Sequence, residues 1–181
     1  FQGDDGIDLD QNYAGTINGF AVLHGDGIGT DEGVEIDGPE NATYTNGLFT
    51  LKNGLCKSVG ATDGTPGDFK SKAQGTVENV TFDYSSVGGE NLKIRASYVN
   101  CAGAKEDAFT HLTDGVPTLT FTNAKFAGVD VYTASDNAGV ACVVPGVDQT
   151  AADAAMTSGT GGTIVPATLF SWTAAGLRSE L

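Results

Sequence analysis

Residues 76–99, with the sequence TVENVTFDYSSVGGENLKIRASYV, carry the clearest fold signal in the chain. Apolar and polar side chains alternate over residues 80–84, and they alternate again over residues 92–98. A period of two places one face of a strand in a core and the other in water. The Ser- and Gly-rich residues between the two runs have the composition of a turn. The sequence therefore predicts a hairpin of two antiparallel strands over residues 77–99.

The same period recurs along the chain and predicts about eight to ten short strands. We expect them at residues 16–24, 33–37, 42–46, 48–52, 76–84, 91–99, 117–123, 126–133, 139–144 and 163–170. Helix signal is confined to residues 150–156, where Thr150 and Asp153 make a pair similar to a capping box. Many short strands with polar turns predict an all-β fold: an antiparallel β-sandwich, similar to a jelly roll, with at most one short helix.

A right-handed parallel β-helix is the alternative fold, because residues 120–126 resemble one rung of a solenoid. A solenoid needs a recurring period of about 20–25 residues, and the apolar triplets show no fixed spacing. The length of 181 residues suits a single β domain over residues 1–181. Residues 1–15 could form an extended N-terminal arm of that domain.

Charge and motifs exclude several classes of function. The net charge of -14 and the sequence pI of about 4.1 argue against nucleic-acid binding, which needs clustered Lys and Arg. No run of about 18 apolar residues predicts a transmembrane segment. We expect no enzyme, because the chain has only 2 His, no Gly-x-Ser-x-Gly elbow and no His-Glu-x-x-His zinc motif.

The composition points to an exported protein, located outside the cell or at its surface. Lys and Arg are scarce, at 9 residues, and Gly is abundant, at 26. The first residue is Phe1 rather than Met, as removal of a signal peptide would leave it. Cys56, Cys101 and Cys142 leave three arrangements open: one disulfide with one buried thiol, three buried thiols, or a bridge between subunits.

The strongest candidate metal site lies near the N-terminus, because residues 1–51 hold ten carboxylates and no Lys or Arg. Its expected ligands are Asp4, Asp5, Asp8, Asp10 and Asn12. The last three are spaced by two, so on an extended segment they share one face. Ca²⁺ takes six to eight oxygen ligands of this kind. The spacing also matches the start of an EF-hand loop, but Tyr13 replaces the required Gly, so an EF-hand is rejected.

A second acidic group is expected in the Gly-rich residues 25–33, where its ligands are Asp26, Asp31 and Glu32. The same stretch has the glycine spacing of a phosphate cradle. It lacks the Lys of a P-loop, and its three carboxylates would repel phosphate. We therefore expect Ca²⁺ rather than a nucleotide here.

These observations favour a secreted structural protein, a subunit of an extracellular filament or surface assembly. Apolar residues occur near both ends of the chain, as at residues 7–23, and a terminal strand can complete a neighbour's sheet. The expected partner is a further copy of the chain, in a homo-oligomer or homopolymer joined by terminal-strand donation, with Ca²⁺ offsetting the repulsion. The alternative function is a monomeric extracellular module that binds carbohydrate or another ligand.

Overall fold

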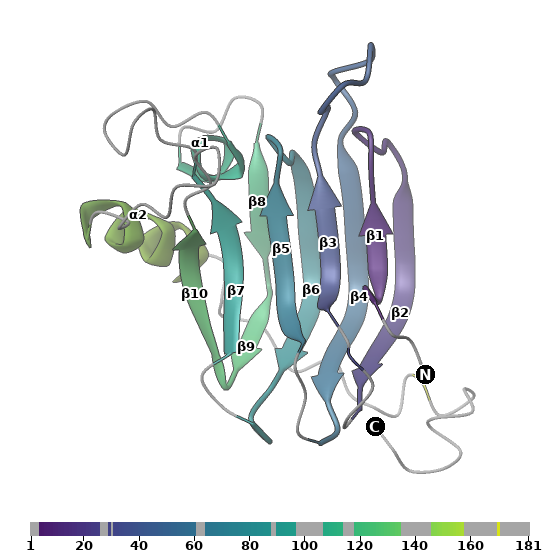
Figure 1. Ribbon diagram of the computed structural model, residues 1–181, viewed down its shortest axis with the longest axis vertical. Helices are drawn as coiled ribbons and strands as arrows, with labels where there is room; N and C mark the ends of the chain where they lie inside the picture. Colours follow the sequence, from purple (N-terminus) through teal and green to yellow (C-terminus); the bar gives the residue numbers. More distant parts are fainter. Residues whose placement is uncertain are drawn as a thin grey trace.

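The computed structural model describes residues 4–25, 29, 31–60, 64–87, 90–96, 107–113, 118–134, 146–157 and 170. These residues form two parallel β-sheets and two helices. Figure 1 shows the sheets as two layers, with the helices gathered at one end.

Sheet A is the front layer in Figure 1. Its strands follow the order β1-β3-β5-β7-β10, and every neighbouring pair is parallel. The strands are β1 (Ile7–Leu9), β3 (Glu32–Asp37), β5 (Thr65–Lys70), β7 (Glu90–Arg95) and β10 (Val129–Ala134).

Sheet B is the rear layer, with the order β2-β4-β6-β8 and with β9 paired to β6. Its strands are also parallel. They are β2 (Thr16–His24), β4 (Phe49–Ser58), β6 (Gly75–Asp83), β8 (Leu119–Thr122) and β9 (Lys125–Ala127). The helices α1 (Ala108–Thr113) and α2 (Gly146–Thr157) contact β7, β8 and β10.

The predicted antiparallel β-sandwich is wrong, because all strand pairs of the described residues are parallel. From β1 to β7, consecutive strands alternate between the two sheets. The segment after β6, predicted as a hairpin turn, therefore leads from sheet B to β7 in sheet A. The alternation of apolar and polar residues shows only that one face of a strand is buried, and it does not show whether the neighbouring strand is parallel or antiparallel. Here each parallel sheet buries one face against the other sheet, which produces the pattern that antiparallel sheets usually show.

The alternative, a right-handed parallel β-helix, is not confirmed either. Thr16, Thr50, Thr76 and Thr120 occupy successive positions of one register in sheet B. They are 34, 26 and 44 residues apart, so the chain has no fixed repeat of the expected length. Connections of such different lengths explain why no period was visible in the sequence.

Helix content also differs from the expectation of at most one short helix. The predicted residues 150–156 lie within α2, but α1 was not predicted. Asp107 precedes α1, and its Oδ1 accepts hydrogen bonds from the backbone N–H groups of Ala108 (2.7 Å) and Lys72 (2.9 Å). With only six residues, α1 is too short for an apolar periodicity to stand out.

The strand positions agree better than the topology. The predicted strands at 16–24 and 33–37 coincide with β2 and, within one residue, with β3. Residues 42–46 form no strand, and β5 (Thr65–Lys70) was not among the predicted strands. The strand predicted at 139–144 and most of that at 163–170 lie outside the described residues.

Asparagine side chains form a ladder along sheet B, and they explain why Asn53-Gly54, a dipeptide typical of turns, lies inside β4. Asn53, Asn79 and Asn123 have positive φ angles of 55°, 52° and 55°, a conformation that Asn tolerates well. Hydrogen bonds run from Asn53 Nδ2 to Asn18 Oδ1 (2.7 Å), from Asn79 Nδ2 to Asn53 Oδ1 (3.2 Å), and from Asn123 Nδ2 to Asn79 Oδ1 (2.6 Å). The chain thus bends at Asn53, at Asn79 and at Asn123, and hydrogen bonds between neighbouring Asn side chains stabilise the bends.

Asn79 lies in the middle of this ladder, and its replacement by alanine should lower the free energy of unfolding by about 2 kcal/mol. Two hydrogen bonds are lost, each contributing about 1 kcal/mol, and alanine adopts positive φ less easily. Urea denaturation measures the effect. Asn79→Gly is the matched variant, because glycine loses the hydrogen bonds without the backbone strain. A loss below about 0.5 kcal/mol for Asn79→Ala would show that the ladder is not stabilising.

The core lies between the two sheets. Val34, Ile36, Leu92 and Ile94 from sheet A are at most 1% exposed, and Leu51 from sheet B is fully buried. Aromatic rings fill the centre: the Phe82 and Phe126 rings stack at 5.4 Å, and Phe69 contacts both Phe49 and Phe121. Because the inner faces are filled in this way, the polar side chains of β1, β3, β5 and β7 lie on the outer face of sheet A.

Candidate functional site

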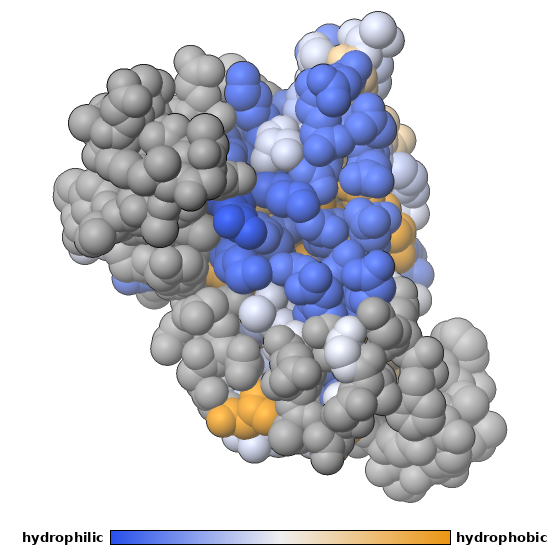
Figure 2. Space-filling model, in the orientation of Figure 1, coloured by the Kyte–Doolittle hydropathy of each residue, from blue (hydrophilic) through white to orange (hydrophobic). Residues whose placement is uncertain are grey.

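The outer face of sheet A is an array of charged side chains. The parallel register aligns Asp8 with Glu35, Glu35 with Asp68, and Asp68 with Lys93. Figure 2 shows this face as an almost continuous hydrophilic area over β1, β3 and β5. Residues that are 25 to 33 positions apart in the chain thus become direct neighbours.

Cations from β5 and β7 neutralise part of this array. Lys70 Nζ forms an ion pair with Glu35 and lies 3.5 Å from Asp37 Oδ2. Lys93 Nζ lies 2.9 Å from Glu32 Oε1 and 3.9 Å from Asp68 Oδ2.

Asp68 is the most deeply buried carboxylate of the array, at 1% exposure. Arg95 Nε donates to both of its carboxylate oxygens, at 2.9 and 3.0 Å. The positive charge therefore lies on the β5 and β7 side of the sheet, and the β1 and β3 side stays acidic.

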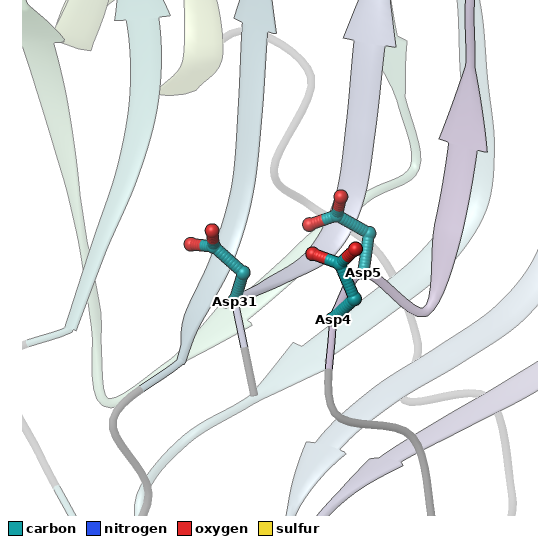
Figure 3. Close-up of side chains that lie close together, drawn as sticks. All are labelled: Asp4, Asp5 and Asp31. Carbon is teal, nitrogen blue, oxygen red and sulfur yellow. The ribbon is translucent and has the colours of Figure 1, made fainter. Parts of the chain in front are cut away.

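Among the described residues, three groups of three carboxylates lie on that acidic side. They are Asp4–Asp5–Asp31, Asp5–Glu32–Glu35 and Asp8–Asp10–Asp37. In each group the three residues offer oxygens within 4.8 Å of one another, a spacing that could hold a metal ion. Figure 3 shows the first group, with Asp4 and Asp5 from the segment before β1 and Asp31 from the segment before β3.

Asp5 belongs to the first two groups and Glu32 to the second, and both lie in a protein environment that disfavours their charge. Burial raises the pKa of Asp5 to about 6, Glu35 adds to the rise, and the hydrogen bond from the Glu32 backbone N–H (2.8 Å) opposes it. Burial raises the pKa of Glu32 to about 7, the neighbouring Asp31 adds to it, and Lys93 opposes it. Both carboxylates therefore carry a free-energy cost when they are ionised.

Two carboxylates of the third group, Asp8 and Asp37, also have raised pKa values. Burial raises the pKa of Asp8, and the charges of Asp10, Glu35 and Asp37 add to it. Burial also raises the pKa of Asp37, partly offset by Ser71 and Lys70. Glu40, in the turn after β3, has its pKa raised by slight burial, by Asp37 and by Asp10, so a fourth carboxylate lies nearby.

The structure regroups the predicted metal ligands. Asp4, Asp5, Asp8, Asp10, Asp31 and Glu32 all belong to one of the three acidic groups. Asn12 does not: its Nδ2 donates to Tyr44 O (3.1 Å), and its Oδ1 accepts from Gln74 Nε2 (3.1 Å). Asn12 therefore connects three segments of backbone. Asp26 lies outside the described residues.

Glu35 and Asp37 were missed as candidate ligands. Both belong to a stretch predicted as a strand, where they share its polar face. The sequence contained no indication that this strand pairs with residues 7–9, so their closeness to Asp8 and Asp10 could not be predicted. The β1–β3 register supplies it.

Both histidines connect structural elements. His24, at the end of β2, is 2% exposed, and its Nδ1 lies 3.0 Å from the hydroxyl of Tyr84, just after β6. Burial lowers the pKa of His24, so the ring is neutral at neutral pH. His111 Nδ1 lies 3.0 Å from the carbonyl oxygen of Ala73 and joins α1 to the segment before β6.

Cys56 is a free, buried thiol, and burial raises its pKa. It is therefore a structural residue of β4 with low reactivity. Cys101 and Cys142 lie outside the described residues, so the alternatives that the sequence allows for these two cysteines stay predictions.

No family model matches the chain, and no curated protein or solved structure matches it. Of the two helices in the described part of the chain, neither is long and apolar enough to span a lipid bilayer.

Proposed function

We propose that the protein is a secreted structural subunit that self-assembles outside the cell, in a filament or surface layer. The observation that carries this proposal is the strand β2 at the end of sheet B. It has nine residues, and within the described residues its only strand partner is β4. A long edge strand presents unpaired backbone N–H and C=O groups, which can pair with another chain.

The two ends of the sheets differ in whether helices cover them, and this difference favours a contact through the end that holds β1 and β2. Helices α1 and α2 cover the end that holds β8 and β10 (Figure 1). β1 and β2 form the opposite end. Two copies joined through β2 would form a symmetric pair, because the same strand serves both partners. A filament then requires a second contact between such pairs.

The N-terminal strands enter this contact as part of their own sheets. β1 pairs with β3, and β2 pairs with β4 of the same chain. The contact we propose is therefore edge-to-edge pairing of two intact sheets. It replaces the terminal-strand donation expected from the sequence, in which a strand would leave its own sheet. The acidic groups of β1 and β3 lie at the same end, so divalent cations would reduce the repulsion between two copies.

Ala21→Lys tests the proposal, because Ala21 is an exposed residue of β2 and a lysine on an edge strand opposes pairing. Wild-type protein should form dimers or larger assemblies in light scattering and electron microscopy with Ca²⁺ present. The variant should stay folded and monomeric. Thr122→Lys adds the same charge at β8, at the other end of sheet B, and should assemble normally. Assembly by Ala21→Lys would contradict the edge contact.

A monomeric module that binds carbohydrate is the second candidate function. Tyr13 and Tyr44 are 39% and 57% exposed and follow β1 and β3, and the hydrogen bond from Asn12 Nδ2 to Tyr44 O connects their segments. Exposed tyrosine rings can stack on sugars. A wild-type protein that stays monomeric at every concentration would favour this function over assembly.

A further inference from the structure

Asp37, the last residue of β3, has a carboxylate oxygen without a partner. The residue is 5% exposed, and among the described residues its Oδ1 accepts no hydrogen bond. Its Oδ2 lies 3.5 Å from Lys70 Nζ. A buried polar atom of this kind is rare in folded proteins and calls for an explanation such as a bound ion. For a carboxylate oxygen the missing partner is a donor or a cation.

Asp8 and Asp10 place two further carboxylates beside Asp37. The pairing of Leu9 with Ile36 brings the residues on either side of Leu9 next to the end of β3. All three residues offer an oxygen within 4.8 Å of the others. Asp8 and Asp10 are exposed, so this group has a buried inner carboxylate and two outer ones that solvent ions can reach.

The other two acidic groups differ in their internal partners. In Asp5–Glu32–Glu35, Lys93 pairs with Glu32 and Lys70 pairs with Glu35. Asp5, shared by both groups, accepts the backbone hydrogen bond of Glu32 through Oδ1. A buried carboxylate oxygen without a hydrogen-bond partner is found in the described residues only at Asp37.

We propose that Asp8, Asp10 and Asp37 bind a divalent cation, and that this cation is Ca²⁺. Ca²⁺ accepts oxygen ligands at about 2.3–2.6 Å in a flexible geometry, whereas Mg²⁺ demands near-ideal octahedral geometry at about 2.0–2.1 Å. A group of one buried and two exposed carboxylates that was not built as a rigid octahedron therefore suits Ca²⁺ better than Mg²⁺. Three carboxylates also supply up to six oxygens, and water completes the coordination. The site lies within one chain and does not depend on assembly.

Isothermal titration calorimetry tests the site on the full chain after EDTA treatment and dialysis. Wild-type protein should bind Ca²⁺ with a Kd on the order of 10⁻⁴ to 10⁻³ M, the range of extracellular calcium modules, and should bind Mg²⁺ more weakly. The double variant Asp8→Asn/Asp10→Asn should lose this binding. Both positions are exposed, so circular dichroism should show an unchanged fold. Asp37→Asn should lose the binding as well.

The control is Asp4→Asn/Asp31→Asn, which removes the same charge from another acidic group and should bind Ca²⁺ as wild type does. Three results would overturn the site: no heat of binding in wild type, unchanged binding by the Asp8/Asp10 double variant, or an equal loss in the control. The last result would indicate a diffuse attraction of cations to the whole face. Binding by a protein that never assembles would support the site and contradict only the proposed function.

Discussion

Phe69→Ala should lower the free energy of unfolding by about 3–5 kcal/mol, the range measured for large buried aromatic residues. Phe69 belongs to β5 of sheet A and is fully buried. Its ring lies 6.3 Å from that of Phe49 in β4 and 5.2 Å from that of Phe121 in β8, both in sheet B. The substitution therefore opens a cavity at the contact between the two sheets. The total stability of a domain is about 5–15 kcal/mol, so the variant should be close to unfolding.

Urea denaturation followed by circular dichroism measures this loss. Leu48→Ala is the control, because Leu48 is 52% exposed and its truncation should change stability by less than about 0.5 kcal/mol. If Phe69→Ala costs no more than Leu48→Ala, the two sheets do not share the core described above. The same measurement then rejects the stacking of sheet A on sheet B.

Glu32→Gln should stabilise the protein at pH 8 by roughly 3 kcal/mol, because the pKa of Glu32 is raised from 4.5 to about 7. The folded state holds the proton more tightly than the unfolded state. The ionised form is therefore penalised above pH 7, and the penalty disappears as the pH falls toward 4.5. The free energy of unfolding of the wild type should therefore rise as the pH falls from about 7 to 4.5. The rise should be much smaller in the variant. EDTA keeps cations from masking the effect.

Other groups near Glu32 also titrate, so the measurement needs a control. Asp5, with a pKa of about 6, acts in the same direction as Glu32, whereas the lowered pKa of His24 reduces stability below about pH 6.5. The comparison with Glu78→Gln removes both effects together with that of net charge. Glu78 lies on β6 in sheet B, away from the acidic groups, and its variant should follow the wild-type curve. Parallel curves for Glu32→Gln and Glu78→Gln would contradict the prediction.

The positions of several strands could be predicted because they depend on neighbouring residues. The alternation at residues 16–24 and 33–37 reflects which side chains are buried, and β2 and β3 follow it closely. β5 escaped prediction because Thr65, Pro66 and Gly67 have the composition of a loop. In the structure Gly67 lies so close to Val34 that a Cβ atom would meet its carbonyl oxygen at 2.9 Å. Glycine is there for close strand packing, and composition alone cannot distinguish that role from a turn.

The acidic site was found only in part for a related reason. Asp8 and Asp10 are two residues apart, so their common face follows from strand geometry. Asn12 has the same spacing, but positive φ angles at Gln11 (54°) and Asn12 (59°) end the extended segment and turn its side chain toward Tyr44 and Gln74. Asp37 is distant in sequence and joins the group through the β1–β3 register.

Local sequence was thus sufficient for the presence of short strands, for their buried faces and for the excess of carboxylates in residues 1–51. The direction of the strands, their assignment to two sheets and the grouping of Asp8, Asp10 and Asp37 came from the folded chain. The physical reason is that alternation depends on the burial of each residue, whereas pairing depends on connections of 26 to 44 residues between equivalent positions in sheet B. Contacts across such connections are selected by packing of the whole core, and no short segment contains that information.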